Sequence, residues 1–161
     1  MGTAAAANRR LLSLGFFLLI CFGASAAGGI ATFHSMDGWY QDLQKPDWTP
    51  PSAVFGPVWT ILYGMMAVAA WLVWDRFHGA SFQALKLFGY QLGLNVLWPI
   101  LFFGLRNPDA AAAEIVVLWI MIAATTYAFY RLHRLAGSLM VPYLAWVTFA
   151  AFLNFSIAGQ N

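Results

Sequence analysis

The sequence predicts an all-α integral membrane protein, a single domain over residues 1–161 with five transmembrane helices. Hydrophobic side chains make up 61% of the chain and charged ones 9%, against roughly 25% charged in soluble domains. Long apolar runs without polar alternation argue against a soluble domain with a large core. Five stretches reach the roughly 20 apolar residues that a membrane-spanning helix needs. The predicted spans are 11–33, 54–74, 84–103, 110–132 and 138–157.

The first span follows Arg9 and Arg10, and two interpretations compete for it. A basic start, an apolar run and small residues near position 25 resemble a cleaved signal peptide. However, the apolar run continues to Phe33, which is long enough to cross the bilayer. The small residues are then packing contacts, and Ala24 and Gly28, one turn apart, would let another helix approach closely.

A long loop, residues 34–53, connects the first two spans and reads WYQDLQKPDWTPP at its centre. Loops longer than about 12 to 15 residues in a compact protein are usually functional or disordered. This one combines stiffening prolines with aromatic side chains that suit the membrane boundary. These are Pro46, Pro50, Pro51, Trp39, Tyr40 and Trp48. We expect a lid over a ligand pocket; the alternative is a loop that rests on the lipid headgroups.

The second and fifth spans carry aromatic residues below this loop. Trp59 and Tyr63 lie four residues apart, as do Trp146 and Ala150, with Tyr143 beside the second pair. Tryptophan near a helix end often belongs to an interfacial belt. Trp59 and Trp146 lie several residues into their spans and share a face with polar groups, so we expect them to line a pocket.

The third span has two distinct faces. Gln91, Asn95 and Trp98 share one stripe, and a bare carboxamide in hydrocarbon is costly, so this stripe should face the bundle interior. Gly89 and Gly93 form a GxxxG pattern on the other face, which predicts a homodimer through this helix. The alternatives are that the carboxamides only bond neighbouring helices and that the glycines pack within one subunit.

The charge distribution predicts orientation. Six Lys and Arg residues lie on the side of the N-terminus and two on the other side, which favours a cytoplasmic N-terminus and an outward-facing first loop. A net charge of +2 gives no reason to expect a nucleic-acid partner. Glu114, early in the fourth span, is either a functional intramembrane charge or a structural one near a helix N-terminus, and the structural role is favoured.

No metal or covalent chemistry is expected. Cys21 is the single cysteine, so it forms neither an internal disulfide nor a multi-thiol site. The histidines His34, His78 and His133 lie at or beyond helix ends, which argues against a haem ligated by two histidines at mid-membrane depth. We also find no serine-histidine-aspartate set and no glycine-rich phosphate loop.

Five blocks, WYQDLQKPDWTPP, FGPVWTILY, AWLVW, QLGLNVLWPILFF and VPYLAWVTFAAFLN, run in order from Trp39 to Asn154. They resemble the successive signature blocks of the tryptophan-rich sensory protein family (TspO/MBR), which includes the mitochondrial translocator protein, also called the peripheral benzodiazepine receptor. The resemblance implies a five-helix bundle in a bacterial cell membrane. It also implies a homodimer and a pocket covered by the first loop.

The resemblance further implies binding of porphyrins such as protoporphyrin IX or haem, and of benzodiazepines and isoquinoline carboxamides, with no obligatory cofactor. The family's ligand-binding residues correspond to Tyr40, Pro50, Pro51, Trp59, Asn95, Trp98, Trp146 and Ala150. The helical stripes add Tyr63 and Tyr143 to this set. If the family's light-dependent degradation of protoporphyrin occurs here, Trp59 and Trp146 are the expected catalytic residues.

The expected function is therefore that of a membrane receptor or sensor with a regulatory role in a tetrapyrrole or stress response. The alternatives are a light-dependent porphyrin-degrading enzyme and a transporter of porphyrin or lipid-like molecules. The absence of an internal repeat argues against an alternating-access carrier. Sterol recognition is not carried over, because Phe155 stands where a tyrosine is expected and no basic residue follows it.

Overall fold

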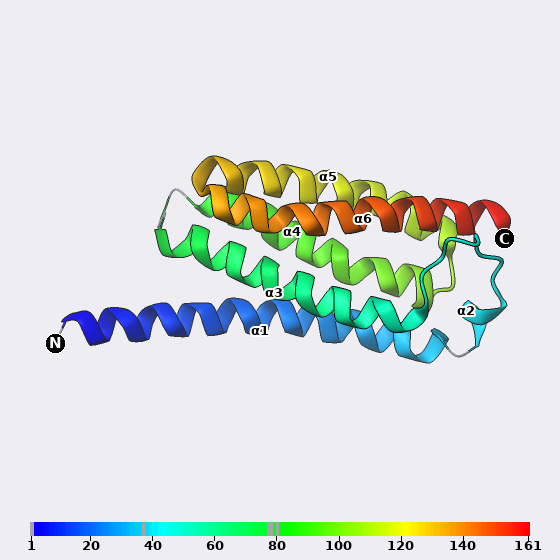
Figure 1. Ribbon diagram of the computed structural model, residues 1–161, viewed down its shortest axis with the longest axis horizontal. Helices are drawn as coiled ribbons and strands as arrows, with labels where there is room; N and C mark the ends of the chain where they lie inside the picture. Colours follow the sequence, from blue (N-terminus) through cyan, green and yellow to red (C-terminus); the bar gives the residue numbers. More distant parts are fainter. Residues whose placement is uncertain (1, 37, 77–78, 80) are drawn as a thin grey trace.

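The computed structural model describes residues 2–36, 38–76, 79 and 81–161. These residues form long antiparallel helices that lie side by side (Figure 1), and no strand occurs among them. The helices are α1 Gly2–Met36, α2 Trp39–Asp42, α3 Ser52–Arg76, α4 Phe82–Pro99, the π-helix η1 Ile100–Gly104, α5 Pro108–Leu132 and α6 Arg134–Gln160. Within the described part of the chain, five helices are long and apolar enough to cross a membrane, which agrees with the prediction of five transmembrane helices.

The helices extend beyond the predicted spans because hydropathy marks only the apolar part of a helix. α1 begins at Gly2 rather than at residue 11, and α6 runs from Arg134 to Gln160. Only His133 separates α5 from α6, and its ring Nδ1 accepts a bond from the Ala136 N–H at 3.4 Å.

The start of α5 is fixed by local chemistry. The Asn107 side chain accepts a hydrogen bond from the Ala110 N–H at 3.0 Å. Pro108 follows as the first helical residue, where its missing N–H is not needed. The cap and the proline together hold the turn between η1 and α5.

The end of α4 widens into η1 at a proline. Pro99 has no N–H to continue the α-helical pattern, and η1 follows directly, with the Leu105 N–H donating to the Ile100 carbonyl at 2.8 Å. A π-turn changes the direction in which side chains point. Phe102 and Phe103, adjacent in sequence, are both buried as a result.

Helix α1 lies along α3 and α4 on one side of the bundle, and α5 pairs with α6 on the other (Figure 1). Gly28 permits a close approach to α4, because a Cβ there would lie 3.1 Å from Pro99 Cγ. This agrees with the packing contact predicted at Gly28. At the opposite end of the bundle, an Arg10–Asp75 ion pair of 2.9 Å joins α1 to α3.

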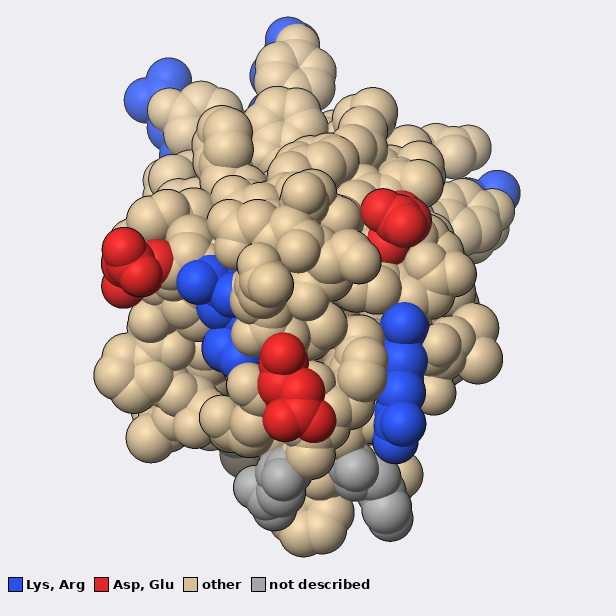
Figure 2. Space-filling model, turned by 90° about the vertical axis from the view of Figure 1, so that its right-hand side faces the viewer, with Lys and Arg blue, Asp and Glu red and all other residues tan. Residues whose placement is uncertain are grey.

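The two halves of the bundle differ in how their side chains pack. In the half far from α2, small and apolar residues of α3, α5 and α6 form a closed core, among them Ala70, Val73, Phe129 and Met140, none of which is exposed. The other half, next to α2, contains the candidate site. Figure 2 views the molecule from this end, where acidic and basic side chains stand apart on a mostly uncharged surface.

Candidate functional site

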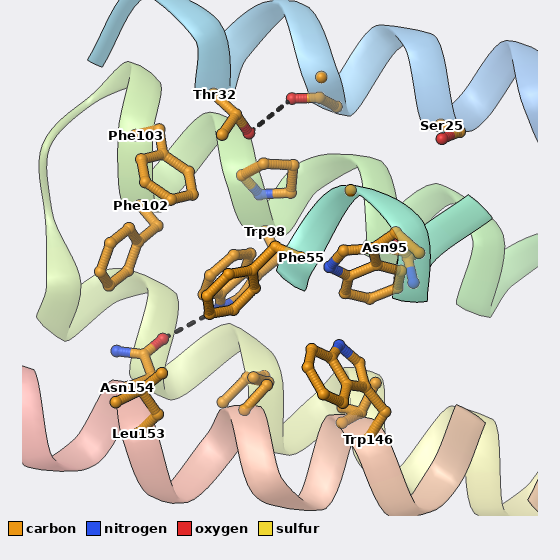
Figure 3. A pocket seen from close by; sticks show the side chains of 18 of the residues that line it. Ser25, Thr32, Phe55, Asn95, Trp98, Phe102, Phe103, Trp146, Leu153 and Asn154 are labelled. Carbon is orange, nitrogen blue, oxygen red and sulfur yellow. Dashed lines mark hydrogen bonds between the residues drawn. The ribbon is translucent and has the colours of Figure 1, made fainter. Parts of the chain in front are cut away.

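A cavity of about 490 Å³ lies among α1, α3, α4, η1, α5 and α6 and is bordered by α2. Its volume falls in the range of about 300 to 1,000 Å³ that small-molecule sites occupy. Figure 3 shows aromatic rings from several helices around a common space, with few polar groups among them. Such a wall, mostly apolar with a few placed polar groups, is typical of ligand sites.

Most of the predicted ligand-binding residues meet at this cavity. Seven of the ten line it: Tyr40, Trp59, Tyr63, Asn95, Trp98, Trp146 and Ala150. Tyr143 lies behind the wall, bonded to Asn95. Pro50 and Pro51 lie in the segment before α3 and are not among the lining residues. Contact of these residues with a ligand stays a prediction.

A chain of buried hydrogen bonds begins at the cavity wall and leads into the bundle. The Tyr63 hydroxyl donates to Asn95 Oδ1 at 2.5 Å, and Asn95 Nδ2 donates to the Tyr143 hydroxyl. Tyr143 donates to Gln91 Oε1 at 2.9 Å, and Gln91 Nε2 lies 3.9 Å from the Met66 sulfur. The prediction that Gln91 and Asn95 face the bundle interior is confirmed, and both also join neighbouring helices.

The indole rings come from three helices. Trp59 of α3 lies 5.7 Å from the Tyr63 ring, and Trp98 of α4 stacks on Phe102 at 5.0 Å. Trp98 Nε1 donates to Asn154 Oδ1 at 2.9 Å (Figure 3), which fixes the ring. These contacts hold flat apolar faces against the open space.

Trp146 of α6 packs at 5.8 Å from the Phe55 ring and at 5.5 Å from the Phe149 ring. Its Nε1 is buried and has no hydrogen-bond partner among the described residues. A buried N–H without a partner is uncommon and costly. The ring is therefore held by packing alone and keeps an unused donor at the cavity wall.

The segment after α1 contributes Tyr40 to the cavity wall. Tyr40 is buried, with its ring 5.5 Å from Phe103, and burial raises the pKa of its phenol, so it stays neutral. Lys45 Nζ donates to the Tyr40 carbonyl at 2.6 Å. Gln44 and Asn161 exchange two hydrogen bonds of 3.0 Å, which fasten this segment to the end of α6.

The cavity is open on another side. Four of its lining residues are exposed: Gly29 and Phe33 on α1, and Gly56 and Thr60 on α3. A Cβ added at either glycine would meet nothing within 4 Å. The lining residues from α4, η1, α5 and α6 are all buried or half-buried. The mouth therefore lies between α1 and α3, on the lipid-facing side of the bundle.

Sequence reasoning missed the contribution of α1. Ser25, Gly28 and Thr32 line the cavity in addition to the two exposed residues of this helix. A run of small residues one turn apart was the available signal, and it predicted only packing. Sequence reasoning also missed Phe102 and Phe103 as lining residues. The π-turn that brings both side chains inside has no sequence signature beyond Pro99.

Two further predicted features lie away from the cavity. Gly89 and Gly93 are exposed, and a Cβ at either would meet nothing within 4 Å, so they do not pack within one chain. Glu114 lies in the second turn of α5, near the helix N-terminus as predicted, and it is buried. Neither of its carboxylate oxygens has a hydrogen-bond partner among the described residues.

The structure gives no position for a metal in the part of the chain it describes, since no three His, Cys, Asp or Glu residues come together there. His78 and the side chain of His34 lie outside the described residues. Cys21 is a fully buried free thiol in α1.

Comparison with known proteins agrees with this architecture. The model of the TspO/MBR family matches residues 17–159. The chain is 40% identical to the tryptophan-rich protein TspO of Chlorobaculum tepidum, over 96% of this chain and 99% of the relative. It is 42% identical to the translocator protein of Homo sapiens, over 76% of this chain and 75% of the relative. Protein CrtK of Rhodobacter capsulatus is 33% identical, over 93% of this chain and 95% of the relative. The chain therefore belongs to the TspO/MBR family of membrane proteins.

Proposed function

We propose that the cavity binds flat, largely apolar molecules, with porphyrins such as protoporphyrin IX and haem as the first candidates, and that the chain acts as a membrane receptor or sensor. The supporting observation is the cavity itself, about 490 Å³ with three tryptophans and two carboxamides, Asn95 and Asn154, on its wall. Relatives named as a sensory protein and as translocator proteins agree with a role in ligand recognition.

The wall suits a planar guest. Indole rings stack in an offset manner on aromatic ligands and contribute large apolar contact areas. Trp59, Trp98 and Trp146 all border the space. Asn95 supplies a polar contact that would fix the orientation of a ligand with a carbonyl or carboxyl group.

In this proposal the segment from Gly38 to Pro51 acts as a lid. Tyr40 reaches the cavity from this segment and packs on Phe103, so it would contact the ligand from above. Pro50 and Pro51 would stiffen the return to α3 and need not touch the ligand. A regulatory role would follow if the bound ligand stabilised one position of this lid.

The assembly and orientation are part of the same proposal. The bacterial cell membrane is the proposed location, and the excess of Lys and Arg near the N-terminus favours a cytoplasmic N-terminus. Gly89 and Gly93 leave a shallow exposed surface on α4 where a second copy could approach closely, as small residues permit in lipid. A homodimer through α4 is the proposed state.

Light-dependent porphyrin oxidation is the second candidate. An excited porphyrin would take one electron from Trp59 or Trp146, and molecular oxygen would be the final oxidant. Trp59 has the Tyr63 and Tyr143 rings at 5.7 Å and 6.2 Å, which are close enough to return an electron to an oxidised indole. The porphyrin supplies the photochemistry, and the protein orients it.

Titration of the purified protein with protoporphyrin IX tests the binding proposal. Tryptophan fluorescence should be quenched in a saturable manner, and Trp146→Phe and Asn95→Ala should each weaken the binding. Trp119→Phe is the matched control, because Trp119 bonds Thr148 on the outside of the bundle and does not line the cavity. Unchanged affinity in both cavity variants, or an equal loss in the control, would reject the assignment.

A further inference from the structure

The chain of hydrogen bonds behind Asn95 has a direction, which is set at the end away from the cavity. There the Gln91 amide meets the Met66 thioether, with Nε2 and Sδ 3.9 Å apart. A thioether accepts hydrogen bonds weakly and cannot donate one. Gln91 is therefore favoured with its NH₂ group toward Met66 and its oxygen toward Tyr143.

Each bond then determines the next. A tyrosine hydroxyl has a single hydrogen, and Tyr143 donates it to Gln91 at 2.9 Å. The Tyr143 oxygen can therefore only accept from Asn95, whose Nδ2 faces it. This leaves the Asn95 oxygen toward Tyr63, whose hydroxyl donates to it at 2.5 Å.

The direction of these hydrogen bonds matters because the residues that set it are buried. Met66, Gln91 and Tyr143 are 0% exposed, and none of the three lines the cavity. An unpaired hydrogen in such a place is costly, because no water can replace the missing partner. Asn95 and Tyr63, at the other end of the chain, do line the cavity. The buried residues can thus control what the cavity wall offers.

We propose that Met66, Gln91 and Tyr143 are positioning residues that set the hydrogen-bonding character of Asn95 and Tyr63 toward a ligand. The hydroxyl hydrogen of Tyr63 is used on Asn95, so Tyr63 offers a ligand only oxygen lone pairs. Asn95 keeps one N–H beyond its bond to Tyr143. Asn95 and Tyr63 together therefore present one donor beside one acceptor.

This pair selects a chemical class of ligand. A carboxamide, or an undissociated carboxylic acid, carries a carbonyl acceptor next to an N–H or O–H donor and complements both groups. An ester of the same shape only accepts, and it would leave its alkoxy side against the lone pairs of Tyr63. This inference rests on the proposed function, namely that the cavity binds a flat ligand.

Gln91→Leu should reverse the direction of donation along this series of hydrogen bonds. Without the Gln91 oxygen, the Tyr143 hydrogen has no partner on that side, so Tyr143 turns to donate to the Asn95 oxygen. The Asn95 amide then rotates and donates to Tyr63. The Tyr63 hydrogen is released toward the cavity, and the acceptor at the wall becomes a donor.

The binding test compares two neutral probes with the same ring, the diamide and the dimethyl ester of protoporphyrin IX. We expect the wild type to bind the diamide about tenfold more tightly, the effect of roughly one hydrogen bond. Gln91→Leu and Tyr143→Phe should both lose this preference. Thr125→Val should retain it, because Thr125 is equally buried but bonds the Met121 carbonyl within α5. The proposal would be overturned if Gln91→Leu and Tyr143→Phe both kept the wild-type ratio of diamide to ester affinity. An equal loss of this preference in Thr125→Val would also overturn it.

A second readout needs no ligand. The infrared C–O stretch of a tyrosine differs between a phenol that donates and one that accepts a hydrogen bond, and subtraction of Tyr63→Phe isolates the band of Tyr63. It should report a donor in the wild type and shift in Gln91→Leu. An unshifted band would contradict the inference even if the porphyrin binds. If no porphyrin binds the wild type while the band shifts, the proposed function fails and the direction of the chain stands.

Discussion

The Asn95 carboxamide of α4 accepts the Tyr63 hydroxyl of α3 at 2.5 Å and donates to Tyr143 of α6. One buried side chain at the cavity wall thus joins three helices. Asn95→Leu leaves two phenols without their shared partner. We expect a loss of about 1 to 3 kcal/mol in unfolding free energy, the cost of unsatisfied buried groups.

Reversible unfolding in mixed micelles measures this loss. Gln83→Leu on the exposed face of the same helix is the matched control and should change stability little. Equal effects at the two positions would show that the hydrogen-bonded chain does not stabilise the bundle.

Adjacent glycines of α1 should respond differently to a larger side chain. A Cβ at Gly28 would lie 3.1 Å from Pro99 Cγ, whereas one at Gly29 would meet nothing within 4 Å. Gly28→Val should therefore destabilise the bundle by about 1 to 3 kcal/mol, as overpacking does. Gly29→Val should have little effect on stability. Thermal unfolding measures the melting temperatures of the two variants. Similar melting temperatures would contradict the packing described at Gly28.

The position of the cavity mouth predicts slower binding when it is narrowed. Gly29→Leu and Gly56→Leu place side chains at the exposed gap between α1 and α3, where there is room for them. We expect both variants to slow association and dissociation of protoporphyrin IX in stopped-flow fluorescence, with less change in affinity. Gly23→Leu is exposed on α1 but does not line the cavity, so its rates should equal those of the wild type.

The bonds between Gln44 and Asn161 predict that residues 38–51 become more mobile when these bonds are removed. Asn161→Ala deletes both bonds to the Gln44 backbone. Amide hydrogen exchange between residues 38 and 51 should accelerate, while exchange within α3 should not change. Asn8→Ala, exposed near the start of α1, serves as a control. Unaltered exchange in the segment would mean that other contacts, such as those of Lys45, suffice to hold it.

The exposed glycines of α4 predict the oligomeric state. Gly89→Leu and Gly93→Leu add bulk where a second copy would approach in the proposed dimer, and we expect both variants to be monomers. Light scattering on size-exclusion chromatography measures the mass. Gly15→Leu, exposed on α1, should leave it unchanged. Retention of the dimer in both α4 variants would place the interface elsewhere.

Hydropathy and helical periodicity predicted the parts of this protein that depend on local pattern. Apolar runs located the five spans, and four-residue spacing placed Gln91 and Asn95 on the inner face. Helix ends were less predictable, because polar ends such as the start of α1 continue the helix outside the apolar run.

Features that depend on contacts between helices could not be predicted. The direction of the chain from Met66 to Tyr63 depends on three helices meeting in one register. The cavity mouth depends on the distance between α1 and α3, which small residues allow but do not specify. The burial of Phe102 and Phe103 follows from the π-turn after Pro99.

Filling the cavity from within tests whether this cavity is the ligand-binding site. Ala150→Trp places an indole in the space among Trp59, Trp98 and Trp146, whereas Ala145→Trp places one on the exposed face of the same helix. Equilibrium titration in nanodiscs should show that Ala145→Trp binds protoporphyrin IX like the wild type, and that Ala150→Trp folds but no longer binds it. Undiminished binding by a folded Ala150→Trp protein would contradict the account, because the ligand would then lie outside this cavity.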